Sequence, residues 1–361
     1  MKKVTSTDVA RLAGVSQSTV SMVLNNKIGP SFSEETKNKV LDAARQLGYM
    51  LPAQSISVPD KNIIAVFIPT LSNPYYTQLT SCIEKYALSK GYKILLCNTS
   101  RNKEYESYYL DYFSKTKVAG IIFTFVPSYP QMAEQLALSL PIVLIGEKTV
   151  DMTIPSIELN NVKAGVIMGE HLLSLGHFHF AFLSTPLDNL SLARRQRLEG
   201  LKIALKEKMP QGSLDIFISD HIAESDTTTS PYEYEVGYGL TKKVLSSKSS
   251  ATALIGVNDM TAIGIIGCLY DSGFHVPDHY SVCGFDNIFV SGVSIPSITT
   301  IEHHLPLRGQ SAVDLILSRQ SASQLGRSAS LIAPQVNKIE YDPELLIRRS
   351  TGPCRCRRDI Q

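Results

Sequence analysis

Apolar residues recur at helical spacing in three short segments at the amino-terminal end of the chain. The third segment is expected to begin at Ser31 or Ser33 and to run to about Leu47. The residues expected on the inner faces are Val9, Leu12 and Ala13 in the first segment, Val20, Val23 and Leu24 in the second, and Val40, Leu41, Ala44 and Leu47 in the third. The pattern therefore predicts three helices around a small common core.

The residues at the ends of the first two segments indicate where these helices start and stop. Thr5 is expected to cap the first helix, because Asp8, three positions later, can accept a hydrogen bond from the Thr5 amide. Gly14 supplies a left-handed backbone that ends this helix, and Ser16 caps the next one. Two helices joined by so short a turn form a helix-turn-helix, in which the second helix enters the DNA major groove.

Four residues of the second helix lie outside its apolar stripe, namely Gln17, Ser18, Ser21 and Met22. They are candidates for contacts with the edges of DNA bases. The alternative interpretation is a small helical domain with an ordinary polar surface. Caps, a turn glycine and an apolar stripe coincide in one short window, and this coincidence favours DNA binding.

After a linker at residues 50–62, apolar runs of strand length alternate with helical stretches. The runs are rich in branched and aromatic residues, as buried parallel strands are. They cover residues 63–68, 94–97, 118–125, 142–145, 180–183, 216–218, 253–257 and 282–285, separated by helical stretches such as 76–90, 164–175, 192–208 and 261–272. Strict alternation predicts an α/β fold of doubly wound parallel sheets.

The runs are too many for one open sheet, and a break near Asn160-Asn161 divides them into two Rossmann-like lobes. In such sheets ligands bind beyond the carboxyl ends of the strands. The residues found just after the runs are Asn73, Pro74, Tyr75, Tyr76, Glu147, Asn160, Asn258, Asp259, Asp286 and Asn287. Aromatic rings mixed with amides and carboxylates suit a small polyhydroxylated ligand between the lobes.

Composition narrows the remaining classes of function. The chain has 361 residues, of which 43% are hydrophobic and 19% charged, and its net charge of +2 requires any contact with nucleic acid to be local. We expect a cytoplasmic protein, because we find neither a secretory signal nor an apolar membrane span. No phosphate-binding glycine loop and no Gly-x-Ser-x-Gly elbow occurs, so we expect no cofactor and no enzymatic activity.

Three pairs of histidines or cysteines and one arginine are residue types that often bind metals or ligands, but we assign none of them to such a site. The pairs in question are His177 with His179, His303 with His304, and Cys354 with Cys356. Each pair lacks further ligands at useful spacing, so the histidines are assigned to the surface or to strand edges and the cysteines to an inert tail. We interpret Arg194 as part of a solvated helix start.

Taken together, these motifs resemble the lactose-repressor (LacI) family of bacterial transcription regulators, and the resemblance covers nearly the whole chain. The residues that carry it are Asp8 to Ser16, Ser18 to Ser21, Leu47-Gly48-Tyr49, Gly120-Ile121-Ile122, Arg197 to Gly200, Asn258-Asp259, Gly284 to Asn287 and Leu346 to Ser350. It implies a headpiece, a hinge and a core similar to periplasmic sugar-binding proteins, working as a homodimer on a roughly palindromic operator.

The resemblance also implies domain boundaries. The headpiece would span residues 1–49, the hinge 50–62, the core 63–350 and a mobile tail 351–361. Within the core, one lobe would hold residues 63–160 with about 290–322, and the other 161–289 with about 323–350. The tail lacks the leucine heptads of tetrameric relatives, so we expect a dimer.

Roles for individual residues follow from the same resemblance. Gln17, Ser18 and Met22 would contact base edges, and the residues that would hold phosphates are Thr5, Ser16, Ser21 and Asn25. The effector pocket would include Tyr75, Tyr76, Glu147, Asn160, Arg197, Tyr232 and Asp286. Arg197 would offer a planar donor fork and Asp286 would accept two hydroxyl protons, so that together they grip a sugar. The alternative for these two residues is a structural salt bridge.

The hinge departs from the family. Relatives carry an Ala-Arg-x-Leu segment that wedges a leucine into the minor groove, and this chain lacks it. Leu51 and Ile56 are weak candidates for the wedge, and Pro59 limits any hinge helix to under two turns.

The sequence thus predicts a ligand-responsive transcription regulator, most simply a repressor. Two alternatives remain open: a sugar-binding module whose headpiece is vestigial, and an enzyme that acts on a sugar in the same cleft.

Overall fold

A computed structural model describes residues 4–24, 32–47, 49, 62–149, 151–188, 191–220, 231–324 and 337–354. The chain divides into two compact units, Met1–Pro59 and Asp60–Gln361, and each has its own hydrophobic core. Predictions that lie outside the described residues concern Asn25, Ser31, Leu51, Ile56 and Cys356.

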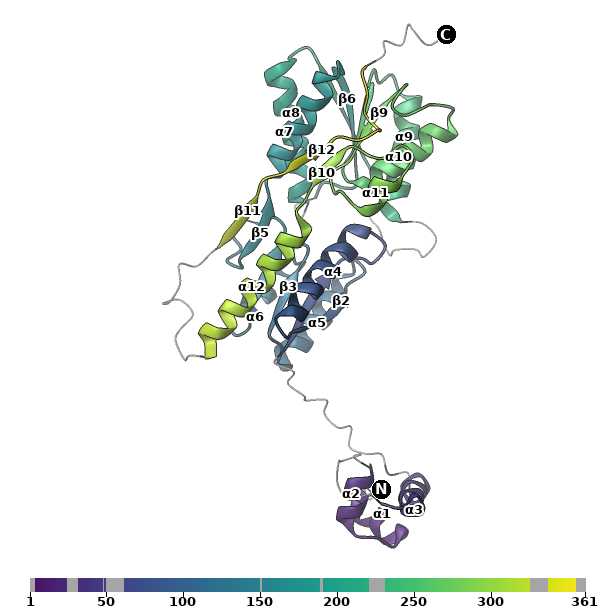
Figure 1. Cartoon of the computed structure of the whole chain (residues 1–361), viewed down its shortest axis with the longest axis vertical. Helices are drawn as coiled ribbons and strands as arrows, with labels where there is room; N and C mark the ends of the chain where they lie inside the picture. Colours follow the sequence, from purple (N-terminus) through teal and green to yellow (C-terminus); the bar gives the residue numbers. More distant parts are fainter. Residues whose placement is uncertain are drawn as a thin grey trace. The chain divides into compact units, whose positions relative to one another are not determined.

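The amino-terminal unit contains three helices (Figure 1), which are α1 Ser6–Ala13, α2 Gln17–Leu24 and α3 Glu34–Gln46. The predicted caps are present. The Asp8 carboxylate accepts hydrogen bonds from the amide and the hydroxyl of Thr5 at 2.9 and 2.7 Å. Gly14 adopts a φ of 67° at the end of α1, and Ser16 Oγ accepts a hydrogen bond from the Thr19 amide at 3.1 Å.

The core of this unit is narrower than the sequence pattern predicted. Its buried members are Val9, Ala10, Val20, Val40, Ala43 and Ala44. Leu12 and Leu41, predicted to point inward, are instead 48% and 39% exposed. At 3.6 residues per turn each leucine lies about 100° from the middle of its helix's buried stripe, and the alanines in the stripe let the helices pack closely. Ser33 caps α3, since its hydroxyl accepts a hydrogen bond from the Thr36 amide.

The first lobe of the larger unit is built on a parallel sheet with the strand order β11-β5-β4-β3-β1-β2. Its strands are β1 Ile63–Ile68, β2 Lys93–Asn98, β3 Gly120–Phe123, β4 Ile142–Ile145, β5 Ser156–Leu159 and β11 Lys338–Tyr341. Helices α4 Pro74–Ser89 and α12 Leu305–Gln324 pack on one face, and α5 Lys103–Lys115 and α6 Pro130–Ala137 on the other. This is the predicted doubly wound arrangement.

The second lobe repeats the plan on a parallel sheet of order β7-β6-β8-β9. Its strands are β6 His179–Ser184, β7 Ser213–Ile218, β8 Ala253–Gly256 and β9 Ser281–Cys283. Helices α7 Asn161–Ser174 and α8 Leu192–Lys208 cover one face, and α9 Tyr232–Ser246 and α10 Asp259–Asp271 cover the other. Figure 1 shows the lobes joined by several segments.

The positions at which the chain crosses between the lobes differ from those predicted. Strand β11 belongs to the first sheet, although residues 323–350 were assigned to the second lobe. Helix α11, Phe289–Val293, belongs to the second lobe, where Ser291 Oγ donates a hydrogen bond to Asp259. Between the lobes, β10 Thr300–Glu302 pairs antiparallel with β12 Glu344–Leu346. Strands β10 to β12 mix polar with apolar residues over three or four positions, so they do not stand out as apolar runs.

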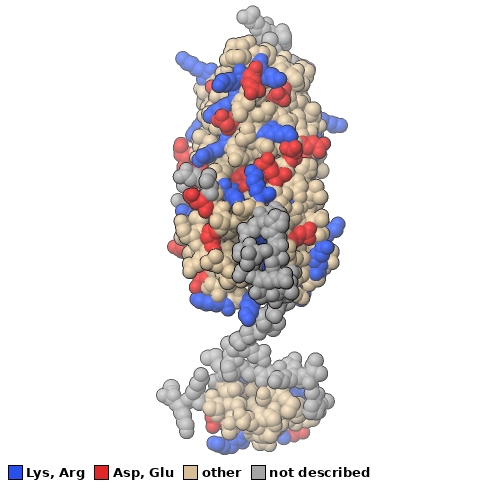
Figure 2. Space-filling model, turned by 90° about the vertical axis from the view of Figure 1, so that its left-hand side faces the viewer, with Lys and Arg blue, Asp and Glu red and all other residues tan. Residues whose placement is uncertain are grey.

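The outermost strands are less buried than predicted. Leu95 and Leu96 on β2, and Ile216 and Ile218 on β7, are 38 to 42% exposed, because each strand lies at an edge of its sheet. Figure 2 shows Lys and Arg interspersed with Asp and Glu over one face of the core, in keeping with the small net charge. In the described part of the chain, no helix combines the length and apolar character needed to cross a bilayer.

Glycines allow the helices of the second lobe to touch backbone to backbone. A Cβ at Gly237 on α9 would lie 2.1 Å from the carbonyl oxygen of Thr261 on α10, and one at Gly264 would lie 2.1 Å from that of Tyr234. This contact fixes the start of α9, which carries residues of the site described below.

Replacing Gly237 with alanine should therefore lower the free energy of unfolding by about 1–3 kcal/mol, as other overpacked interiors do. Gly239, two positions along the same helix, has open space where a Cβ would lie, so Gly239→Ala should raise stability by about 0.5–1 kcal/mol. Urea unfolding followed by circular dichroism measures both. Equal shifts in the two variants would contradict the close contact.

Candidate functional site

A cavity of about 420 Å³ lies between the two lobes, beyond the carboxyl ends of their strands. Six of the predicted effector residues line it, namely Tyr75, Tyr76, Glu147, Arg197, Tyr232 and Asp286. The sequence missed other lining residues that carry charge or hydrogen-bonding groups, among them Arg101, Asn161, Thr185, Glu233, His303 and Arg308. The cavity therefore lies at the strand ends, as predicted, and more residues line it than the sequence predicted.

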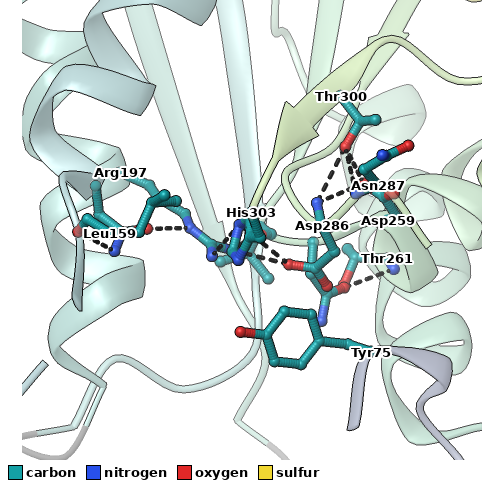
Figure 3. Close-up of polar contacts among 12 residues, drawn as sticks. Tyr75, Leu159, Arg197, Asp259, Thr261, Asp286, Asn287, Thr300 and His303 are labelled. Atoms are coloured by element: carbon teal, nitrogen blue, oxygen red, sulfur yellow. Dashed lines mark hydrogen bonds and ion pairs between the residues drawn. The ribbon is translucent and has the colours of Figure 1, made fainter. Parts of the chain in front are cut away.

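Arg197 of α8 directs its guanidinium toward Asp286 and His303 (Figure 3). Its Nε donates a hydrogen bond to Asn161 Oδ1 at 2.8 Å, and its Nη1 donates one to the Val257 carbonyl at 2.7 Å. The guanidinium lies 5.1 Å from the centre of the Phe285 ring. These contacts fix the plane of the fork, so that Arg197 is presented to the cavity in one orientation.

Asp286 lies opposite, 3.5 Å from Arg197 Nη1, and both side chains are 7% exposed. The Asp286 amide donates hydrogen bonds to Asp259 Oδ1 and Thr300 Oγ1, both at 3.0 Å, which anchors the backbone and leaves the carboxylate facing inward. Burial raises the pKa of Asp286 to about 7, although Arg197 opposes this shift. The carboxyl can therefore donate or accept hydrogen bonds near neutral pH.

A second cation, Arg308 of α12, is fully buried on the first-lobe side of the cavity. Its Nη1 donates a hydrogen bond to the Tyr75 hydroxyl at 3.1 Å and lies 3.5 Å from His303 Nδ1. Burial, together with Arg197 and Arg308, holds the pKa of His303 well below its usual value. His303 is thus a neutral, buried polar residue of the cavity, which corrects its assignment to the surface or a strand edge.

Asn160 is not among the lining residues, and this corrects the prediction by one position. Its side chain caps α7 by accepting a hydrogen bond from the Lys163 amide at 2.9 Å, and its Nδ2 donates to Glu340 at 3.3 Å. The following residue, Asn161, lines the cavity and donates a hydrogen bond to Glu147 at 2.5 Å. Burial raises the pKa of Glu147.

The structure corrects the interpretation of two further residues, Arg194 and His177. Arg194 lines the cavity and donates hydrogen bonds to Pro186 and Ser191, so it is not a solvated helix start. His177 is buried, with its ring nitrogens bonded to Thr252 and Gly352. Among the described residues, no group of three His, Cys, Asp or Glu side chains could hold a metal ion.

Polar atoms around the cavity that are buried without a hydrogen-bond partner among the described residues include Thr185 Oγ1, Glu233 Oε2 and Arg308 Nε. Native proteins rarely leave such groups unsatisfied. Two acceptors and a donor of this kind are suited to a polar ligand with several hydroxyl groups.

The residues predicted to contact DNA differ in how far they are exposed within their own unit. Thr5, Ser16, Gln17 and Ser18 are exposed, and Ser21 and Met22 on the same helix are half-buried. Gln17 Nε2 donates a hydrogen bond to Ser6 Oγ at 3.0 Å, which holds its amide near the start of α1. Since Val20 is fully buried, the opposite side of α2 faces outward.

Comparison with known proteins agrees with both units. Residues 5–51 match the family described as bacterial regulatory proteins, lacI family, and residues 61–338 match periplasmic binding proteins and sugar binding domain of LacI family. The HTH-type transcriptional repressor PurR of Mannheimia succiniciproducens is 30% identical over 95% of this chain and 97% of its own length. The HTH-type transcriptional regulator DegA of Bacillus subtilis is 30% identical over 97% and 99%.

Solved structures share the fold. A LacI family regulator from Enterococcus faecium with bound ribose matches with a TM-score of 0.67 and 24% identity over 81% of this chain and 100% of its own. The regulator CelR in complex with cellobiose matches with a TM-score of 0.66 and 20% identity over 96% and 99%. With a helix-turn-helix unit, a two-lobed core and relatives matched over nearly their full length, this chain belongs to the LacI family of DNA-binding transcriptional regulators.

Proposed function

We propose that the protein is a repressor whose affinity for operator DNA changes when a sugar or sugar derivative binds between the lobes of its core. Ligand binding between the lobes is supported by the buried Arg197–Asp286 pair, which faces a cavity large enough for a small sugar. A ligand that binds one arrangement of the lobes better than another shifts DNA affinity by about 1–3 kcal/mol, the usual range of allosteric coupling.

At the DNA end, Gln17 pairs with adenine through its side-chain amide, and Ser18 adapts to several bases. Met22 contacts a thymine methyl group, since it offers no hydrogen bond. Thr5, Ser16 and Ser21 hold phosphates and fix the register of the helix without reading sequence.

At the ligand end, a sugar hydroxyl pair accepts from the Arg197 fork and donates to Asp286. The ribose and cellobiose bound to two structural relatives support a carbohydrate, and so do the unsatisfied polar atoms around the cavity. Charge-assisted hydrogen bonds of this kind add both affinity and orientation.

The working form is a homodimer, because two recognition helices double the contact with a palindromic site. Support comes from exposed apolar side chains on the second lobe: Phe289, Val293 and Ile295 are 62, 73 and 96% exposed. An adjoining groove of about 530 Å³ is lined by Ile263, Ile266, Tyr270, Phe274 and Pro296. A second copy of the chain covers this apolar surface. We place the protein in the cytoplasm, where its DNA partner lies.

The decisive experiment measures DNA binding against salt concentration. A duplex enriched from a random pool by the purified protein should bind at least about 1,000-fold tighter than a shuffled duplex. Its affinity should fall about 1,000-fold or more between 50 and 200 mM salt, because bound counterions are released from several phosphates. Gln17→Ala should change which duplex is enriched, whereas Gln46→Ala, at an exposed position of α3, should not.

The two alternative functions predict different results, one in the DNA-binding experiment and one in turnover assays. A sugar-binding module with a vestigial headpiece binds every duplex alike. An enzyme consumes a sugar from a panel in the absence of DNA, and turnover assays would reveal it. Either outcome would refute the proposed function.

A further inference from the structure

An ion pair joins the two lobes across the cavity. Arg101, in the loop after β2 of the first lobe, places its Nη2 2.5 Å from Oε1 of Glu233, the second residue of α9 in the second lobe. The side chains are 19% and 3% exposed, and both line the cavity. Asn73, which caps α4 in the first lobe, approaches the same Glu233 oxygen at 3.5 Å. Glu233 therefore receives donors from two loops of the opposite lobe.

The pair lies far from the segments that connect the lobes. In the first sheet, β5 and β11, which lead into the crossovers, are at one edge and β2 is at the other. In the second sheet, β9 adjoins the crossing chain through a bridge to Thr299, whereas β7, which precedes α9, is at the opposite edge. A contact at the sheet edges opposite the crossovers has a long lever arm with which to resist opening of the lobes.

The loop that presents Arg101 has an unusual backbone. Ser100 and Arg101 have φ values of 50° and 55°, a left-handed conformation that residues with a side chain adopt at a cost. Asn98 holds the turn by accepting a hydrogen bond from the Ser100 amide at 3.1 Å, and the Arg101 amide donates to the Pro69 carbonyl at 2.8 Å. Two successive positions in this region persist only when the surroundings enforce them. Here they direct the Arg101 side chain at the opposite lobe.

The pair is also accessible to whatever occupies the cavity. Glu233 Oε2 is buried, lines the cavity and has no hydrogen-bond partner among the described residues, while Oε1 receives both donors. The Arg101 guanidinium lies 5.9 Å from the centre of the Tyr232 ring, which is itself part of the cavity wall. Removing one partner of a buried ion pair leaves an uncompensated charge that must regain water.

We propose that Arg101 and Glu233 form a latch that holds the two lobes closed in the absence of ligand. Breaking it opens the cavity edge farthest from the crossovers and hydrates the remaining charge. This device goes beyond the proposed function and does not depend on which ligand binds.

The test uses tryptophan fluorescence, because the sequence contains no tryptophan. Phe125→Trp places one reporter in the cavity wall of the first lobe and leaves both latch residues unchanged. In the full-length, sugar-free protein, adding Arg101→Met should increase acrylamide quenching of this tryptophan about twofold, as the population shifts to open lobes. Asp111→Asn serves as the matched control, since it breaks an exposed ion pair with Lys115 on α5.

Glu233→Gln provides a second route, because it keeps the size of the side chain and removes only the charge. It should increase quenching in the same direction as Arg101→Met, and it carries the test alone if Arg101→Met does not fold. Quenching equal to that of the parent in both latch variants would overturn the proposal. An equal increase in Asp111→Asn would overturn it as well. No ligand or DNA is present, so failure here leaves the proposed function standing.

Discussion

Arg197→Ala should abolish the response to sugar while leaving DNA binding intact. The expected loss of sugar affinity is about 100-fold or more, because the proposed contact comprises two charge-assisted hydrogen bonds of about 1.5–3 kcal/mol each. The fold should tolerate the change, since Asp286 can take up a proton when its partner is removed. Thermal unfolding in the presence of ribose, xylulose and cellobiose measures the effect: a sugar that raises the Tm of the parent protein should leave that of the variant unchanged.

Arg195→Ala is the matched control for this experiment. Arg195 lies on the same helix two positions earlier and is exposed, so its loss removes an arginine without touching the cavity. It should preserve the shift in Tm. Both variants should bind the enriched DNA duplex like the parent protein. A sugar response that survives Arg197→Ala would show that the ligand binds elsewhere.

Local signals in the sequence were sufficient for most of the architecture. Caps such as Thr5 and Ser16 act over three or four residues, and buried parallel strands such as Ile63–Ile68 are continuously apolar, so both can be recognised without knowledge of the fold. Strand β5, Ser156–Leu159, could not be recognised. It alternates polar and apolar residues, although all four are buried, because the Glu158 carboxylate is paired with Ser156 and Lys338.

The location of the cavity could be predicted from the sequence, but only some of the residues that line it could be. Arg101 follows the apolar run 94–97 as Tyr75 follows the run 63–68, so the rule applied to other strands would have found it. Arg308 and His303 gave no such signal, because they come from the chain around a three-residue strand that returns to the site from far along the sequence. Asn160 and Asn161 could not be told apart, since which of them caps α7 depends on the direction of the crossover.

Asp286→Asn should make the protein more stable than the parent at pH 8, but not at pH 5. The folded protein holds a proton on Asp286 up to its pKa of about 7, whereas the ordinary value for an unfolded chain is 3.8. Between these values the folded state binds more protons than the unfolded state, so the stability linked to this group falls as pH rises through 7. Integrated from pH 5 to pH 8, the loss is about 2–3 kcal/mol. Asparagine does not titrate in this range, so the Asp286→Asn variant does not undergo this loss of stability.

The variant should therefore match the parent protein at pH 5, where Asp286 is neutral, or be slightly less stable, and exceed it at pH 8. Urea unfolding at both pH values gives the two free energies, and comparing variant with parent cancels the other titrating groups, including Glu147 and His303, which are present in both. Arg197→Ala adds an independent check, because Arg197 lowers the pKa of Asp286. In the Arg197→Ala variant, which lacks that cation and keeps Asp286, the pH at which stability is lost should be higher than in the parent. A difference between Asp286→Asn and the parent that is the same at both pH values would contradict a raised pKa at this position.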